Sequence, residues 1–289
     1  MSVISAFCPG HISCVFQPMT SFDGMSAGSR GIGIRLNRGC TARAEERDDG
    51  VVNIYLDGVQ SVAHITRMTV ETLAPGKGFD IHIDNDLPVS QGFGMSAAGA
   101  LAAGLCVADM TGMTRSDAFK AAHCAEVMGG GGLGDVAAIV AGSDIPIRTV
   151  PGIPPFGKVI NARFRMENLT LGVIGSEMRT ESVLGDPVML KRIRDTAISC
   201  MDSFLDEPTY ENLFAVSNDF SSGSGLESPA IRRAITGLND RGYNAGMCML
   251  GNSVFTDAPE SELWAVLGRA HVRTFRCSSS RKELVTRRE

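Results

Sequence analysis

The stretch DLPVSQGFGMSAAGALAAGL at residues 86–105 combines a proline, two closely spaced glycines and a run of small residues. A helix whose first turn holds only Gly, Ser and Ala leaves its backbone N–H groups bare, and bare N–H groups at the positive end of a helix dipole attract phosphate. The stretch therefore predicts a phosphate site at the start of a helix over Met95–Asp109. The alternative is a closely packed helix of small residues without a ligand.

Two other nucleotide-binding patterns fit this stretch poorly. Gly92, Gly94 and Ala97 satisfy G-x-G-x-x-A, but that fingerprint needs a strand running directly into the loop, and residues 84–90 intervene with a proline among them. The pattern G-x-x-x-x-G-K-[ST] fails because neither Gly-Lys pair of the chain is followed by Ser or Thr. The sequence therefore argues against a dinucleotide-binding fold and a Walker loop.

Composition restricts the class of protein. The 289 residues are 44% hydrophobic and 20% charged, which indicates a packed globular chain of one large or two ordinary domains. The net charge of −5 argues against a nucleic-acid partner. Eight cysteines without a CxxC pair favour reduced thiols and no zinc site. With neither a secretory signal nor an apolar run long enough for a bilayer, we expect a soluble cytoplasmic protein without a membrane partner.

Alternating and β-branched residues predict strands, which dominate the first third, and helical patterns follow them. The expected strands are Val3–Phe7, Gly31–Leu36, Val51–Leu56, Phe79–Ile83, Leu169–Ile174 and Ala245–Leu250. The expected helices are Met95–Asp109, Arg115–Met128 with a capping box of Thr114 and Asp117, Val188–Phe204, Tyr210–Ser221, Pro229–Arg241 and Glu260–Arg269. Four prolines in IPIRTVPGIPPFGKVI predict a boundary near residue 150, hence domains over 1–150 and 151–289.

The small-residue stretch carries a family resemblance. Its pattern P-x-x-x-G-x-G-x-S-A-A, from Pro88 to Ala98, closely resembles the P-x-x-x-G-L-G-S-S-A loop of the GHMP kinases, which include galactokinase, homoserine kinase, mevalonate kinase and phosphomevalonate kinase. CPGHIS at Cys8–Ser13 resembles the family's first motif, a strand and turn, and GMCMLGNSVF at Gly246–Phe255 resembles its third. The resemblance implies an α+β fold with two domains, an N-terminal one like ribosomal protein S5 domain 2 and a C-terminal ferredoxin-like α/β sandwich.

Within the family, four segments are most similar to archaeal pantoate kinases, which prepare pantoate for coenzyme A synthesis. They are PGHIS, GSRGIGI at Gly28–Ile34, AHCAEVMGGGGLGDVAA at Ala122–Ala138 and MLGNSVF at Met249–Phe255. This resemblance implies an ATP- and Mg²⁺-dependent kinase with the small molecule pantoate as its acceptor. Two residues depart from the family pattern, since Met95 replaces the first serine of a Ser-Ser pair and His11 stands where some members have a lysine.

The resemblance assigns ATP to the loop residues Pro88, Gly92, Phe93, Gly94, Met95, Ser96 and Ala97. It also makes Ser96 and Glu126 ligands of Mg²⁺ and catalytic residues. The helix position of Glu126 supports an inward carboxylate, because Ala122 and Phe119 precede it on the side expected to be buried, and a buried carboxylate needs a cation. The alternatives are a helix cap for Ser96 and a solvated charge for Glu126.

Asp135 is the third catalytic residue that the resemblance implies, as the base that takes the proton of the attacking alcohol. The alternative is a cap for a helix beginning at Val136. The acceptor pocket implied by the resemblance comprises Ser29, His123, Arg148 and Thr180. Recognition of a carboxylate favours an arginine fork, for which Arg148 is the candidate, whereas a surface or loop role is the ordinary alternative for Arg148 and Thr180.

Three functions compete at this point. They are a pantoate kinase, a kinase of the same fold for mevalonate, homoserine or a sugar, and a nucleotide-binding protein of another class, either a dehydrogenase or a non-catalytic sensor. Ser96, Glu126 and Asp135 distinguish a kinase from the third class of function. A dehydrogenase does not need these residues at this spacing, and a sensor can lose Asp135. The sequence assigns no adenine contacts and leaves a homodimer open.

Overall fold

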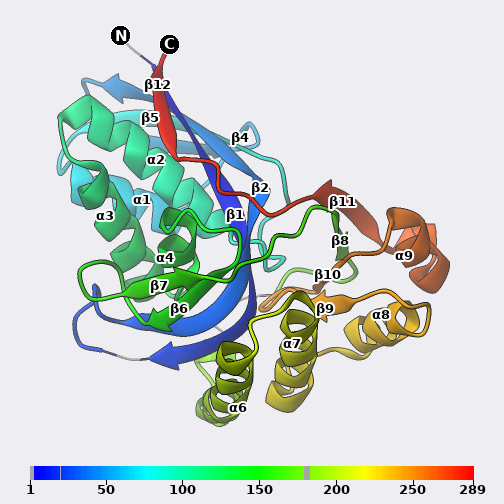
Figure 1. Cartoon of the computed structure of the whole chain (residues 1–289). Helices are drawn as coiled ribbons and strands as arrows, with labels where there is room; N and C mark the ends of the chain where they lie inside the picture. The colour runs from blue at the N-terminus through cyan, green and yellow to red at the C-terminus, as the bar shows by residue number, and fades with distance from the viewer. Residues whose placement is uncertain (1–2, 20, 179–182) are drawn as a thin grey trace.

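The computed structural model describes residues 3–19, 21–178 and 183–289, whose strands form two sheets (Figure 1). The larger sheet has the order β12-β1-β2-β5-β3-β4, with β6 paired to β2 and β7 paired to β6. Its strands are β1 (Ile4–Met19), β2 (Gly28–Arg47), β3 (Val52–Leu56), β4 (Val59–Gln60), β5 (Gly78–Asn85), β6 (Pro146–Val150), β7 (Lys158–Asn161) and β12 (Val285–Arg288). All pairs are antiparallel except β3 with β5.

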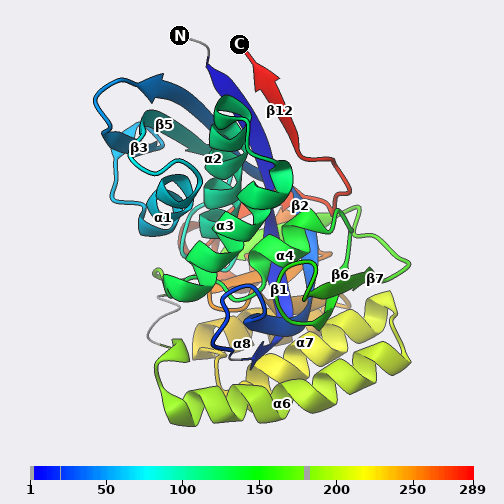
Figure 2. The same cartoon turned by 90° about the vertical axis from the view of Figure 1, so that its left-hand side faces the viewer.

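Helices α1 to α4 lie beside the larger sheet. They are α1 (His64–Leu73), α2 (Met95–Thr111), α3 (Arg115–Met128) and α4 (Asp135–Val140). Figure 2 shows α1, α2 and α3 side by side over one face of the sheet. The predicted capping box of Thr114 and Asp117 is present at the start of α3.

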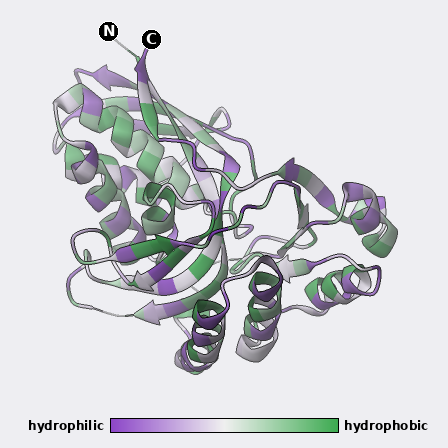
Figure 3. Cartoon of the chain, in the orientation of Figure 1, coloured by the Kyte–Doolittle hydropathy of each residue, from purple (hydrophilic) through white to green (hydrophobic). Residues whose placement is uncertain are grey.

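Helix α2 lies at the centre of this layer. Its residues from Met95 to Ala108 are buried except Ser96, and Figure 3 shows mainly hydrophobic colours along it. Gly104 faces the side chain of Thr69 on α1, where an added Cβ would lie 3.0 Å from a methyl carbon. Small side chains therefore let α2 pack against both the sheet and its neighbouring helices, which explains the alanine run after the first turn.

The smaller sheet has the order β11-β8-β10-β9 and is antiparallel. Its strands are β8 (Leu169–Val173), β9 (Ala245–Met247), β10 (Ser253–Thr256) and β11 (Arg273–Cys277). The helices between these strands are α6 (Pro187–Asp206), α7 (Tyr210–Ser224), α8 (Pro229–Asn239) and α9 (Glu260–Leu267). Helices α6 and α7 also pack against β1, where the rings of Phe16 and Phe220 lie 5.4 Å apart. The long strand β1 therefore contributes to both halves of the core.

The expected strands and helices are all present, with boundaries shifted by a few residues except at β1 and β2. The turn implied for Cys8–Ser13 is wrong, because β1 continues through it to Met19. A register shift between Pro9 and His11 interrupts the pairing with β2. Such a bulge accommodates a proline, which has no N–H to donate to the ladder.

The division into domains at residue 150 stays a prediction. Strand pairing places two later segments in the larger sheet, since β7 at Lys158–Asn161 pairs with β6 and β12 at Val285–Arg288 pairs with β1. Within the part of the chain that the structure describes, the helices are too short or too polar to cross a membrane.

Candidate active site

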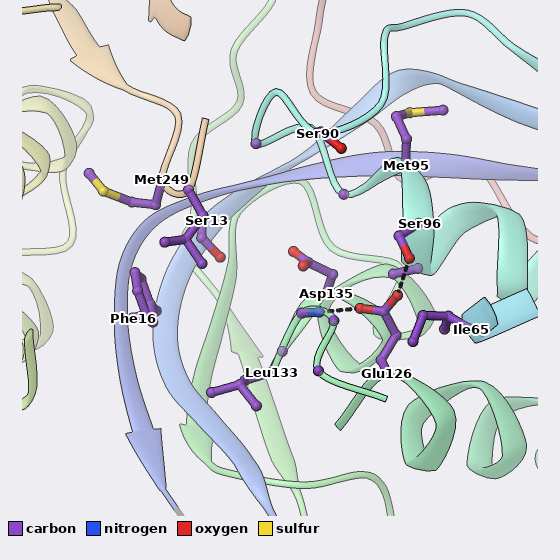
Figure 4. A pocket seen from close by; sticks show the side chains of 18 of the residues that line it. Ser13, Phe16, Ile65, Ser90, Met95, Ser96, Glu126, Leu133, Asp135 and Met249 are labelled. Carbon is purple, nitrogen blue, oxygen red and sulfur yellow. Dashed lines mark hydrogen bonds between the residues drawn. The ribbon is translucent and has the colours of Figure 1, made fainter. Parts of the chain in front are cut away.

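A pocket of about 400 Å³ lies where the glycine-rich loop, the segment between α3 and α4, and β1 meet. Figure 4 shows Ser96 and Glu126 on one side of it, Phe16, Leu133 and Met249 on the other, and Asp135 between them. We call Gly92–Ala97 and Glu126 the loop end. The strand end consists of Ser13, Phe16, Ser29, Leu133, Asp135 and Met249.

Backbone geometry makes glycine necessary at two positions of the loop end. Gly92 and Gly94 have φ of 76° and 65°, in the left-handed region that favours glycine. An added Cβ at Gly92 would lie 2.8 Å from the Cys248 carbonyl oxygen, and one at Gly94 would lie 2.8 Å from that of His11. The two glycines therefore let the loop pass between β1 and the turn from β9 to β10. Gly94 is the cap residue of α2 and no side chain caps the helix, which leaves its first N–H groups available to an anion.

Ser96 and Glu126 are hydrogen-bonded across the loop end. The Ser96 hydroxyl donates to Glu126 Oε1 at 2.6 Å, and the Gly132 backbone N–H donates to Oε2. Glu126 is 1% exposed, as its helix position predicts, and is not a solvated charge. Burial, with a smaller contribution from the charge of Asp135, raises the pKa of Glu126 to about 7. The N-cap of α2 is Gly94, so the Ser96 hydroxyl is not used as a helix cap.

The loop end suits a magnesium ion shared with bound phosphates. Among the described residues, no group of three His, Cys, Asp or Glu side chains could hold a metal ion by itself. Mg²⁺ is usually bound by one or two protein oxygens together with waters and substrate phosphates, which the Ser96–Glu126 pair can supply. A cation would also favour the ionised form of the buried Glu126. The described pocket lining contains no lysine or arginine, so the charge of a bound phosphate would have to be neutralised by backbone N–H groups and a metal.

Asp135 is the first residue of α4, and the cap position is Gly134, with no side-chain hydrogen bond to the helix. The alternative of an Asp135 cap on a helix beginning at Val136 is therefore wrong. Instead, Oδ1 of Asp135 lies 2.6 Å from Nδ1 of His11, which is completely buried, while the Asp135 side chain is 20% exposed. The carboxylate is thus held from behind and open to the pocket.

Arg148 lies behind the strand end with 1% exposure. Its Nη1 is 3.4 Å from His11 Nε2, its Nη2 donates to Ser13 Oγ at 3.3 Å, and its buried Nε has no hydrogen-bond partner. An added Cβ at Gly134 would lie 2.4 Å from Arg148 Nε and 2.5 Å from Ser29 Oγ. Both atoms therefore pack directly against Gly134, where a side chain would collide with them.

Comparisons with known proteins identify the family of this chain. Residues 59–143 match the GHMP kinases N terminal domain. A pantoate kinase of Methanospirillum hungatei is 30% identical over 266 residues, which cover 90% of this chain and 89% of that protein. The chain belongs to the GHMP kinases. A pantoate kinase of Thermococcus kodakarensis is also 30% identical, over 90% of this chain and 89% of its own.

Solved structures extend the likeness to nearly the full length of this GHMP kinase. A phosphotransferase related to the CoA biosynthesis pathway is 26% identical, has a TM-score of 0.88 and covers 99% of this chain and 98% of its own. A homoserine kinase from Cytophaga hutchinsonii shares the fold at a TM-score of 0.68 and 14% identity, over 99% of this chain and 97% of its own. The α+β fold expected for the family is confirmed.

The pocket of this GHMP kinase brings together most of the predicted site residues. Those lining it are Ser29, Gly92, Phe93, Gly94, Met95, Ser96, Ala97, Glu126 and Asp135. Pro88 and Arg148 are not among the lining residues, and Thr180 lies outside the described residues. His123 is buried away from the pocket and its Nε2 donates to the Ala27 carbonyl at 3.0 Å, so it holds the chain just before Ser29.

Several residues that line the pocket of this GHMP kinase were not predicted as site residues from the sequence. They are Ser13, Phe16, His64, Ile65, Leu133, Met178, Leu184, Met249 and Leu250. The quoted motifs CPGHIS, AHCAEVMGGGGLGDVAA and GMCMLGNSVF contain Ser13, Leu133, Met249 and Leu250, so these four had a signal. His64 and Ile65 had none, because the start of α1 has no side-chain cap and follows Ala63 in the left-handed region at φ 37°.

Proposed function

We propose that this GHMP kinase transfers the γ-phosphate of ATP to the terminal hydroxyl of pantoate, giving 4-phosphopantoate and ADP in coenzyme A biosynthesis. The two pantoate kinases that share 30% identity over nine-tenths of the chain motivate this acceptor. The observation in this chain that carries it is the strand end, where a partly exposed carboxylate lies between an apolar wall and buried cationic and hydroxyl groups.

The chemistry of pantoate fits that end. Pantoate has a carboxylate, two hydroxyls and two methyl groups on one carbon. Phe16, Leu133 and Met249 offer apolar surface for the methyl groups on the side opposite the loop end (Figure 4). Ser29 lines the pocket and its hydroxyl can donate to a carboxylate, while the buried Arg148 guanidinium behind the strand end supplies a positive charge.

The loop end fits the nucleotide. The bare N–H groups at the start of α2 would hold the β- and γ-phosphates, and Ser96 with Glu126 would hold Mg²⁺. When bound, Mg²⁺ supplies neutralisation of the charge that spreads over the transferred phosphoryl group. Asp135, between the two ends, accepts the proton of the attacking hydroxyl, while the apolar wall helps to exclude water.

A substrate panel tests the proposal. The purified protein is incubated with ATP, Mg²⁺ and one of pantoate, 2,4-dihydroxybutanoate, mevalonate or homoserine, and ADP release gives kcat/KM for each. Pantoate should be the best substrate, and the dihydroxybutanoate, which lacks both methyl groups, should fall by roughly 10-fold or more. Homoserine should be poor, since its ammonium would lose hydration beside the apolar wall of Phe16, Leu133 and Met249. A higher kcat/KM for homoserine would show that the acceptor is misassigned.

A further inference from the structure

The buried imidazole of His11 connects the carboxylate of Asp135 to the guanidinium of Arg148. His11 lies at the bulge of β1, is completely buried, and its backbone N–H donates to the Phe93 carbonyl at 3.0 Å. Its Nδ1 lies 2.6 Å from Asp135 Oδ1, and its Nε2 lies 3.4 Å from Arg148 Nη1. The ring is therefore fixed to the glycine-rich loop by its backbone and touches Asp135 and Arg148 with its two nitrogens.

The partners determine where the ring carries its proton. A guanidinium can only donate hydrogen bonds and an ionised carboxylate can only accept them, so Nε2 must accept from Arg148 and Nδ1 must donate to Asp135. One neutral tautomer satisfies both contacts. A doubly protonated ring would point an N–H at the Arg148 N–H groups. Burial, and the nearby charges of Arg148 and Arg35, lower the pKa of His11, although the bond to Asp135 opposes this, and the ring stays neutral.

On the basis of the proposed function, we infer that His11 is a positioning residue, which orients the Asp135 carboxylate through a neutral Nδ1–H while its own ring is held by Arg148. Within the described residues, Oδ2 of Asp135 has no hydrogen bond. Fixing Oδ1 therefore directs the lone pairs of Oδ2 into the pocket. Where some GHMP kinases have a lysine, this chain thus has a directed hydrogen bond in place of a fixed charge.

The proton balance of the transfer follows from this arrangement. The acceptor oxygen bonds to the γ-phosphorus while the bond from that phosphorus to the bridging oxygen of ATP breaks, and the electron pair stays on ADP. The acceptor's proton goes to Asp135 Oδ2 and remains there until product release. His11 does not receive it, because Nδ1 already carries a proton and Nε2 faces Arg148.

Two substitutions of His11 separate the contact of the ring to Asp135 from its contact to Arg148. His11→Asn places an amide N–H one bond from Cγ, where Nδ1 was, and so keeps a donor for Asp135. His11→Gln instead carries its amide near the former Nε2 and leaves Oδ1 of Asp135 without a donor. His82→Asn, on β5 and exposed, is the matched control away from the pocket. The measurements are kcat, KM for ATP and pantoate, and Tm.

The inference predicts that His11→Gln lowers kcat by roughly 10–100-fold, as for a misplaced reacting group, with KM for ATP unchanged. His11→Asn should retain at least several times the kcat of His11→Gln. In the double variant with Asp135→Asn, His11→Gln should add almost nothing to the loss, because it acts through Asp135. Equal losses in the two His11 variants, or losses that multiply in the double variant, would overturn the inference.

A measurement on the unaltered protein guards against variants that do not fold. The chain has five histidines, so ¹⁵N-histidine NMR can resolve their rings. His11 should show the neutral tautomer with the proton on Nδ1, and the tautomer with the proton on Nε2 would contradict the inference. If Asp135→Asn keeps full kcat, the proposed base fails. If it loses kcat while His11→Gln does not, only the role of His11 fails.

Discussion

The loop end of the pocket is made mainly of backbone from one continuous stretch, whereas the strand end is made of side chains from several separate parts of the chain. Gly92, Gly94 and the start of α2 form the loop end, with Glu126 as its one distant contribution. β1, β2, α4 and β6 supply the polar groups at and behind the strand end. The loop end therefore depends on the conformation of a few glycines, whereas the strand end depends on a few polar side chains that are hydrogen-bonded to one another.

Asp135→Asn should give the largest effect and should affect only the strand end. Asparagine cannot accept the proton of the attacking hydroxyl, so kcat should fall by roughly 10²–10⁴-fold. The affinity for ATP and the Tm should hardly change, because Asp135 does not cap α4. Steady-state kinetics, nucleotide titration and thermal melting check this, with exposed Asp84→Asn on β5 as the control. Near-normal turnover would remove Asp135 from the chemistry.

Glu126→Gln should weaken the loop end next. The amide keeps the shape but gives up the ionised oxygen offered to Mg²⁺, so kcat should fall by roughly 10²-fold or more and need more Mg²⁺. Titration of activity with Mg²⁺ at saturating ATP measures this, and Glu71→Gln on the exposed side of α1 is the control. An unchanged Mg²⁺ dependence would show that the metal site lies elsewhere.

The same variant should change how stability depends on pH in the absence of nucleotide. The folded pKa of Glu126, at about 7, lies above its unfolded value, so the buried carboxyl stabilises the fold below about pH 4.5 and this contribution is lost as the pH rises through 7. Near pH 8 the ionised form costs roughly 3 kcal/mol. Glu126→Gln should therefore melt higher than the parent at pH 8, with a smaller difference at pH 5. Parallel pH dependences of Tm would contradict the raised pKa.

Arg148→Lys should affect the strand end alone. An ammonium cannot contact both His11 and Ser13 as the guanidinium does, so the strand end should lose its fixed arrangement and KM for pantoate should rise by roughly 10–100-fold. KM for ATP should stay the same. Arg43→Lys, half-exposed on β2 and paired with Asp84, is the control. If KM for ATP rises equally, the two ends are not separate.

Ser96→Ala should give the smallest effect. Water can replace the hydroxyl both toward Glu126 and toward a metal, so kcat should fall by only about 3–10-fold. Exposed Ser116→Ala on α3 is the control. A loss as large as that of Glu126→Gln would show that the hydroxyl is needed as directly as the carboxylate.

The loop end could be predicted because its signal is contiguous. Residues 86–105 alone contain two glycines at positions that only glycine can occupy. A helix start without a capping side chain follows them. The inward position of Glu126 followed from helical periodicity within α3. The strand end could not be assembled in this way, because the hydrogen bond from His11 to Asp135 joins residues 124 positions apart. Arg148 was chosen as a substrate fork, yet the fold occupies its Nη atoms with His11 and Ser13.

The account claims that both ends serve one transfer from ATP to a small alcohol. ³¹P NMR of the protein with ATP, Mg²⁺ and pantoate measures this directly. We expect the signal of a phosphate ester at the 4-hydroxyl of pantoate. This signal should grow in step with ADP and should be absent when Mg²⁺ is chelated. Formation of ADP with inorganic phosphate instead of the ester, or no consumption of ATP, would contradict the account.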